Sequence, residues 1–333
     1  MSVLSRPAIL LASAAVAAGL LVAPAAAYAA DTTTDLSASE MRTAVAAVAA
    51  ATGTAAEQGW KSDLDLTVAL GGRTATGRQS IVADPQHGLM GVSSALEDTP
   101  VASVFLDEGS GVYSSLPEDS RTEAALTMMG RPAATFAFTA APTLTLKNDG
   151  PAPMDVVVTS VGAGKRTLHD DGSADLTFAD PVMGAVTLHV DASSVLTAAE
   201  STLDEEDANL SVSVGYGYGP QTVTLPTADE TVQAGTLAKA VAYVEMSGLV
   251  RDSAVTGAAD TRKAAKGGKV KVATLRKLVR RDADRVNDSV NVDVVKVKNI
   301  TAGVRVSATN PWTKKTVAYT VKASGKKVVV KKV

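Results

Sequence analysis

The segment Asp63-Leu64-Asp65-Leu66-Thr67-Val68-Ala69-Leu70, followed by Gly71-Gly72, fixes the main architecture of this chain. Its apolar residues recur at every second position, which is the period of a β-strand with one buried face. The two glycines are typical of a hairpin turn. Residues 74–83 then form the return strand, which Asp84-Pro85 stops. We therefore expect an antiparallel sheet built outward from this hairpin, with one apolar face.

A helix is predicted just before this hairpin. Ser37, with Glu40 three residues later, forms a capping-box pattern, so the helix should run from Ala38 to Glu57 after a polar linker at 32–39. A second hairpin, with strands at 101–106 and 111–115, and then a helix at 117–129 should follow. After this helix, short strands are expected at 165–169, 174–178, 186–190, 195–203, 210–214 and 221–225.

The first thirty residues read as a cleavable signal peptide. A short head with Arg6 precedes an apolar run at 8–22, and Ala27-Tyr28-Ala29 is an A-x-A cleavage site. An uncleaved anchor is the alternative, but the run is shorter than the about 20 residues that a spanning helix needs. We expect residues 1–29 to be removed, leaving a secreted or envelope-associated chain. The bias toward Ala, Val and Thr is typical of a GC-rich bacterial genome.

The sequence contains no cysteine. This excludes disulfides, thiolate metal sites and a cysteine nucleophile. It also excludes acylation at a lipobox cysteine, so we expect no lipid anchor of that kind.

Charge divides the chain in two. Residues 1–230 hold 10 Lys and Arg against 28 Asp and Glu, whereas residues 231–333 hold 22 against 7. A change of this size predicts two units, 30–229 and 230–333. In the basic unit we expect a long helix at 230–266, a second at 272–286, and an antiparallel meander of strands at 290–298, 303–308, 316–323 and 327–331. The fold class is therefore α+β in both units.

Several sequence segments of the acidic unit resemble those of the LolA-like half-barrel of bacterial lipid carriers of the LppX and LprG type. The similar segments, within residues 36–229, are Leu64-x-Leu66-x-Val68, Asp84-Pro85, 111–117 before a helix ending Met129-Gly130, 185–191, 214–218 and 223–230. The resemblance implies a strongly curved antiparallel sheet with covering helices, whose concave apolar face holds acyl chains. Those carriers usually have a lipobox cysteine, which this chain lacks.

The resemblance makes an exported, non-enzymatic lipid-binding or lipid-carrier protein the first hypothesis. A structural or adhesive cell-envelope protein with a filled half-barrel is the alternative. The residues expected to bind lipid are Leu64, Leu66, Val68, Ile81, Val104, Leu106, Met128, Met129, Phe136, Phe138, Phe178 and Leu188. The basic unit is similar in outline to the soluble part of type IV pilin-like proteins, a likeness of shape that implies no function.

The sequence offers few candidates for catalysis or metal binding. His87, His169 and His189 are widely spaced and read as strand and turn residues rather than zinc ligands. Residues 162–165 lack the first glycine and the Ser or Thr of a phosphate loop, and no G-x-S-x-G elbow occurs. Residues 170–175 fit a hairpin turn better than a calcium loop. We expect no catalytic residue, metal or cofactor.

The basic unit has a candidate surface for anionic partners. Arg276, Arg280, Arg281 and Arg285 share one predicted helix, and residues 326–332 form a lysine-rich tail. An anionic membrane or cell-wall polymer is the predicted partner, because polybasic surfaces attract both by charge. The low aromatic content, 4%, argues against nucleic acid. A solvated basic surface, or one docked on the acidic unit, is the alternative.

Overall fold

The structure is a computed structural model that describes residues 31–156, 160–181, 183–205 and 208–333. The predicted signal peptide lies outside the described residues. The strands of the larger sheet are β1 (Thr32–Leu36), β2 (Trp60–Leu70), β3 (Arg73–Asp84), β4 (Leu89–Leu96), β5 (Thr99–Asp107), β6 (Gly111–Ser115), β7 (Phe136–Ala140), β8 (Gly164–Leu168), β9 (Ala174–Asp180), β10 (Gly184–Val190), β11 (Leu196–Glu205), β12 (Ala208–Tyr218) and β13 (Thr231–Gln233). The smaller sheet comprises β14 (Lys296–Ile300), β15 (Gly303–Thr309), β16 (Thr316–Ser324) and β17 (Lys327–Lys332). The helices are α1 (Ala38–Ala56), α2 (Ser120–Met129), α3 (Leu146–Asp149), α4 (Ala234–Val244), α5 (Met246–Ala265) and α6 (Val272–Val290).

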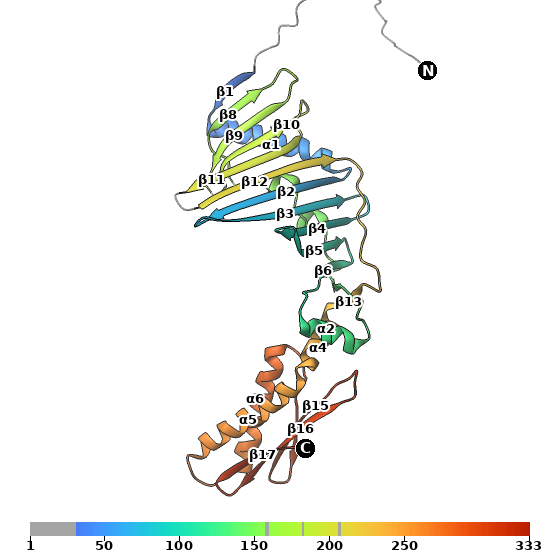
Figure 1. The fold of residues 1–333 in the computed structure, drawn as a ribbon, viewed down its shortest axis with the longest axis vertical. Coiled ribbons are helices and arrows are strands. Elements are labelled where there is room, and N and C mark those ends of the chain that lie inside the picture. Colours follow the sequence, from blue (N-terminus) through green and yellow to red (C-terminus); the bar gives the residue numbers. More distant parts are fainter. Residues whose placement is uncertain (1–30, 157–159, 182, 206–207) are drawn as a thin grey trace, which may run out of the picture.

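The larger sheet is curved and does not close. Its strand order is β1-β8-β9-β10-β11-β12-β2-β3-β4-β5-β6-β7-β13, so β1 and β13 are its edges. Neighbouring strands are antiparallel except β7 and β13, which are parallel. Figure 1 shows this sheet at one end of the molecule and the smaller sheet at the other. The α+β class with a large curved antiparallel sheet is confirmed.

The predicted central hairpin is confirmed. β2 and β3 pair from Trp60 with Ala83 to Leu70 with Arg73. Gly71 and Gly72 form the turn with φ of 55° and 77°, a conformation that glycine adopts without strain.

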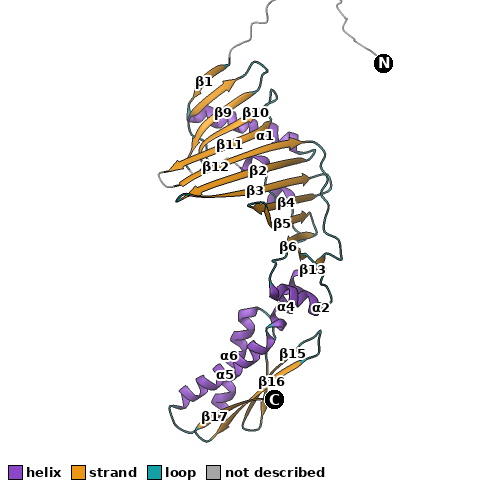
Figure 2. Ribbon diagram, in the orientation of Figure 1, coloured by secondary structure: helices purple, strands orange, loops and turns teal. Residues whose placement is uncertain are grey.

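The helix before the hairpin is also confirmed, together with its capping box. The Glu40 backbone N–H donates to Ser37 Oγ at 3.3 Å, and the Ser37 N–H donates to Glu40 Oε2 at 2.8 Å. α1 lies behind the strands in Figure 2. It packs on them through its buried residues Met41, Val45 and Val48.

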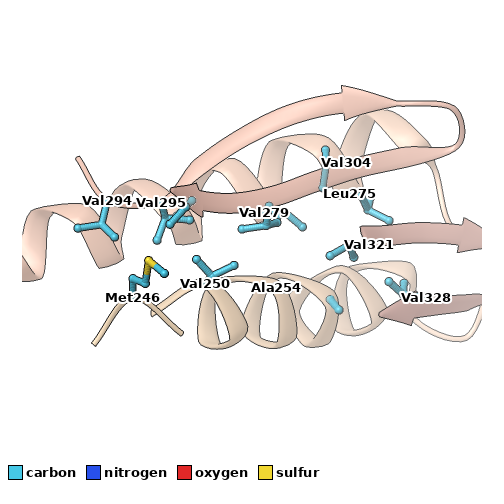
Figure 3. Packing of buried hydrophobic residues seen from close by; sticks show 14 of the residues in the cluster. Met246, Val250, Ala254, Leu275, Val279, Val294, Val295, Val304, Val321 and Val328 are labelled. Atoms are coloured by element: carbon cyan, nitrogen blue, oxygen red, sulfur yellow. The ribbon is translucent and has the colours of Figure 1, made fainter. Parts of the chain in front are cut away.

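In the basic half, two helices pack on one face of the four-stranded sheet. Figure 3 shows Val250 of α5, Val279 of α6 and Val304 of β15 pointing into the same core. The two helices lie very close, because a Cβ added at Gly257 would lie 2.8 Å from the Val279 Cα. The predicted order of helices followed by a meander is confirmed.

Four predictions about secondary structure are wrong. The strand expected at 290–298 begins only at Lys296, because α6 continues to Val290 and residues 291–295 are irregular. The expected linker at 32–36 is an edge strand, β1, which pairs with β8. The expected single helix at 230–266 starts as a strand and is then two helices, because Glu245 takes a turn conformation (φ −89°, ψ 0°) between α4 and α5. The expected strand at 221–225 is irregular, and its buried Val223 packs beside Gly91 of the larger sheet.

The boundary predicted at residue 230 falls next to a set of contacts. Thr231–Gln233 forms β13 on the larger sheet, and α4 packs against α2. The Arg121 guanidinium also pairs with Glu245 at 2.9 Å. The division into two units stays a prediction, but these contacts associate residues 231–244 with the first unit. Within the described residues, no helix is both long and apolar enough to cross a membrane.

Candidate functional site

The face of the larger sheet that contacts α1 is called the inner face. Leu188 and Val214 belong to it, since both pack against Met41, Val45 and Val48 of α1. Val214 lies opposite Leu64. Because side chains alternate along a strand, Leu66 and Val68 lie on the inner face with Leu64.

Most of the inner face is filled by the protein itself. Over β9–β12, α1 buries Phe178 and Leu188. Over β3–β5, Leu144 packs against Ile81 and Leu106. These two clusters are ordinary close-packed core, in which no acyl chain fits without displacing a side chain.

Two tyrosines help to hold this filling in place. The Tyr216 hydroxyl donates to the Pro153 carbonyl at 2.8 Å, and the Tyr218 hydroxyl donates to the Leu196 carbonyl at 2.7 Å. Burial raises the pKa of both phenols, that of Tyr218 to about 12. Both hydroxyls therefore stay neutral donors over the whole physiological range.

Where β2, β3 and β4 extend beyond α1, the inner face is open. This region, called the tip groove, has a volume of about 380 Å³. Its apolar lining comes from Leu64, Leu66, Leu96 and Val101. Leu96 is 53% exposed and Val101 64% exposed, which is unusual for large apolar side chains that lie together.

The strand register explains the shape of the tip groove. Gly77 lies between Leu66 and Leu96 in the register and has no side chain to fill the space. A Cβ at Gly77 would make only ordinary van der Waals contacts, the nearest at 3.7 Å with the Ala95 carbonyl oxygen and the Leu66 side chain, so a side chain could start there without a clash. A β-bulge between Ser94 and Ala95 leaves Val101 as an extra residue at the rim of the groove.

The opposite face of the same strands is polar. Arg78 bridges two carboxylates there, Asp65 at 3.0 Å and Asp98 at 2.9 Å. A shallow hollow of about 370 Å³ on this face is lined mostly by Asp63, Arg78 and serines. The tip groove, which Gln79 and Ser94 also line, is therefore the more apolar of these two hollows at the strand tips.

The residues predicted to bind lipid fall into three groups. Leu64 and Leu66 line the tip groove, and Val68 continues the same face half-buried. Four residues are fully packed core: Ile81, Leu106, Phe178 and Leu188. Val104 packs partly buried against the Leu144 cluster.

The structure does not bring the remaining four to the groove. Phe136 and Phe138 lie on the opposite face, where their rings contact Phe105 (5.6 Å between centroids) and Tyr113 (4.8 Å). Phe105 marks the opposite face, because it is adjacent in β5 to Leu106, which points inward, and successive side chains of a strand alternate. Met128 and Met129 of α2 pack among the helices near the junction of the two halves: Met129 in the α2–α4 cluster, Met128 also against the smaller sheet's core.

Gly77, Leu96 and Val101 line the tip groove but were not among the residues predicted to bind lipid. Leu96 ends β4, a strand that was not predicted. The only local signal is that two large apolar residues flank the turn residues Glu97 and Asp98. No pattern in the sequence around Gly77 indicates that this residue separates Leu66 and Leu96 in the sheet.

The histidines form small polar clusters. His169 bridges Asp31 (Nδ1, 3.1 Å) and Asp175 (Nε2, 3.3 Å), and His189 Nδ1 lies 2.7 Å from Asp175. The hydrogen bond to Asp31 is the main reason why the pKa of His169 is raised. Across the described ranges, no group of three or more His, Cys, Asp or Glu side chains is arranged to hold a metal ion. The hairpin turn predicted at 170–175 is confirmed between β8 and β9, where it spans residues 169–173.

The four predicted arginines lie on α6, but three are engaged within the protein. Arg276 donates to the Ile300 carbonyl at 2.9 Å. Arg281 pairs with Asp260 and with the buried Asp282, and Arg285 also pairs with Asp282 at 3.3 Å. Arg280 is exposed and lines an open hollow with Lys277. The helix face is thus a mixed surface rather than a purely basic one.

Comparison with known proteins assigns no family. No family model matches the chain, and no curated protein matches it. Among solved structures, an uncharacterized conserved protein from Thermus thermophilus is 14% identical over 57% of this chain and 98% of that chain, with a TM-score of 0.29. A DUF1329 family protein from Desulfovibrio piger is 7% identical over 56% and 95%, with a TM-score of 0.22. A Vibrio parahaemolyticus domain named for outer membrane lipoprotein sorting is 9% identical over 54% and 90%, with a TM-score of 0.17.

Proposed function

We propose that this protein binds an acyl chain in the tip groove and acts as a non-enzymatic lipid-binding or carrier protein of the cell envelope. The observation that supports the proposal is the tip groove itself, where Leu66, Leu96 and Val101 surround a space above Gly77. Its volume of about 380 Å³ lies within the usual range of small-molecule sites, about 300–1,000 Å³.

Burial of methylenes would supply the affinity. Each buried CH₂ contributes about 0.8 kcal/mol, and part of this offsets the cost of association. Arg78 contributes to the groove lining, but its guanidinium pairs with Asp65 and Asp98 on the other face and keeps these partners when an acyl chain binds. Affinity for an uncharged acyl ester should therefore depend little on salt.

A groove-filling variant tests the proposal. Gly77→Trp projects a large ring from the groove floor, and the backbone there is ordinary strand. Thr76→Trp is the matched control, because the adjacent residue is exposed on the polar face. We expect Gly77→Trp to weaken binding of a fluorescent fatty acid about 50-fold if it displaces about three methylenes, and Thr76→Trp to leave it unchanged.

Equal affinities of the two variants would contradict the proposal. A wild-type protein that binds no fatty acid, and whose organic extract contains no lipid by mass spectrometry, would also contradict it. The second candidate would then stand, an envelope structural protein with a filled sheet. It is favoured by one observation: Val186 and Leu188 beneath α1 are fully buried.

A further inference from the structure

The smaller sheet has one face that no helix of the described residues covers. α5 and α6 pack against its other face, where Val304, Val306 and Val321 are fully buried. Alternation then directs the intervening side chains away from the helices. This second face, called the basic sheet face, carries Lys296, Lys298, Arg305, Lys322 and Lys331, all exposed.

These cations adjoin one another in the register. Lys298 lies opposite Arg305, and Thr320 connects Arg305 to Lys331 across the next two strands. Directly opposite residues of antiparallel strands are about 5 Å apart, and like charges at such positions destabilise a sheet. A bound anionic partner would remove that repulsion.

No Asp or Glu side chain of the described residues pairs with these cations. Residues 294–333 contain ten Lys and Arg and no Asp or Glu. In the part of the chain that the structure describes, none of the five cations forms an ion pair. This differs from α6, where Asp260 and Asp282 engage Arg281.

The shape and chemistry of the face select among anionic partners. The cations spread over four strands in two dimensions, which matches a planar array of headgroups better than one linear polymer. Val329, 49% exposed, lies opposite Lys322 and adds an apolar contact. The face has no aromatic side chain among its described residues, so it offers no stacking platform for bases.

We propose that the basic sheet face docks this protein on an anionic lipid bilayer. The proposal goes beyond acyl-chain binding, because it concerns the other sheet and is independent of the tip groove. It places the docking surface on β14–β17, which include Lys331 of the lysine-rich tail, whereas the sequence also pointed to the arginines of α6. Polybasic surfaces partition onto anionic leaflets with a gain of about fivefold per cation near the surface.

Two charge-matched variants of the full chain test the location. Lys298→Gln with Arg305→Gln removes two cations from the basic sheet face, and Lys277→Gln with Arg280→Gln removes two exposed cations from α6. Binding is measured by co-sedimentation with vesicles of phosphatidylglycerol and phosphatidylcholine in equal parts, at low salt. We expect the sheet variant to bind about 25-fold more weakly and the helix variant to stay within about twofold of the wild type.

Several results would overturn the proposal. They are an equal loss in both variants, a sheet variant that binds like the wild type, wild-type binding that is as strong to pure phosphatidylcholine, or soluble polyphosphate that binds more tightly than the vesicles at equal anion concentration. Circular dichroism checks that the sheet variant is folded; removing the like-charged pair should not lower its melting temperature. Its fatty-acid affinity should equal that of the wild type, so failure of docking and failure of the tip groove are distinguishable.

Discussion

Leu188→Ala and Leu66→Ala should differ sharply in their effect on stability, although both remove the same atoms from the same face of one sheet. Leu188 is fully buried beneath α1, with Leu176 and Ala199 opposite it on the neighbouring strands. The neighbouring strands are each held by backbone hydrogen bonds, so they cannot move in to fill the cavity that a truncated Leu188 would leave. We expect a loss of about 3–5 kcal/mol in unfolding free energy, which combines the lost transfer energy with the cavity left behind.

Leu66 lines the open tip groove instead. Its truncation removes apolar area that is already half in water and leaves no closed cavity. The expected loss is about 1 kcal/mol or less. The order of the two variants should be reversed for fatty-acid affinity: Leu66→Ala should bind more weakly, and Leu188→Ala should bind like the wild type.

The assay is urea unfolding followed by tryptophan fluorescence. The chain has two tryptophans. Trp60 is buried in the larger sheet, whereas Trp312 packs against Tyr243 of α4. A Trp312→Phe background therefore leaves Trp60 to report on the larger sheet alone. If Leu66→Ala is as destabilising as Leu188→Ala, the inner face is filled at the strand tips as well, and the reasoning that defines the tip groove is refuted.

Two further predictions concern pH and the domain boundary. Burial raises the pKa of the Tyr218 phenol from 10.0 to about 12, so the stability that its neutral form contributes is complete below pH 10 and lost as the pH rises through about 12. Tyr218→Phe should reduce, but not abolish, the fall of the unfolding free energy over this interval, because the raised pKa of Tyr216 also contributes to it. An unchanged slope would contradict the burial of Tyr218. Limited proteolysis should release an acidic fragment that ends beyond Val244, because β13 and α4 are attached to β7 and α2; a fragment ending at residue 230 would place the boundary where the charge change predicted it.

Local signals in the sequence were sufficient for much of the fold. The capping box of Ser37 and Glu40 and the Gly71-Gly72 turn each involve residues within a few positions, so they act whatever the rest of the chain does. β1 gives no such signal, because it is a polar edge strand whose partner, β8, lies more than a hundred residues away. The break at Glu245 is similar, since the helical period continues on both sides and the turn is associated with contacts to α2.

The site was less predictable than the fold for a related reason. Alternation identifies which side chains share a face, and it placed Leu64, Leu66 and Leu188 on one face correctly. Which part of that face stays open depends on where α1 and Leu144 lie over it, and that is decided by tertiary packing. The register that aligns Gly77 with Leu66 and Leu96 is likewise a property of three paired strands.

The opposite net charges of the two halves do not neutralise each other at their junction. The ion pair that joins the halves, in the portion described, is Arg121 with Glu245. In this pair each half contributes its minority charge, a cation from the acidic half and a carboxylate from the basic half. The pair therefore neutralises none of the excess charge of either half. The remaining contacts there are packing and hydrogen bonds to neutral groups, among them Met128 with Asn310 and the Arg131 guanidinium with the Thr231 carbonyl at 2.9 Å. Electrostatic attraction is screened beyond about 8 Å at physiological salt, and the basic sheet face is therefore left with its charge available to an external anionic partner.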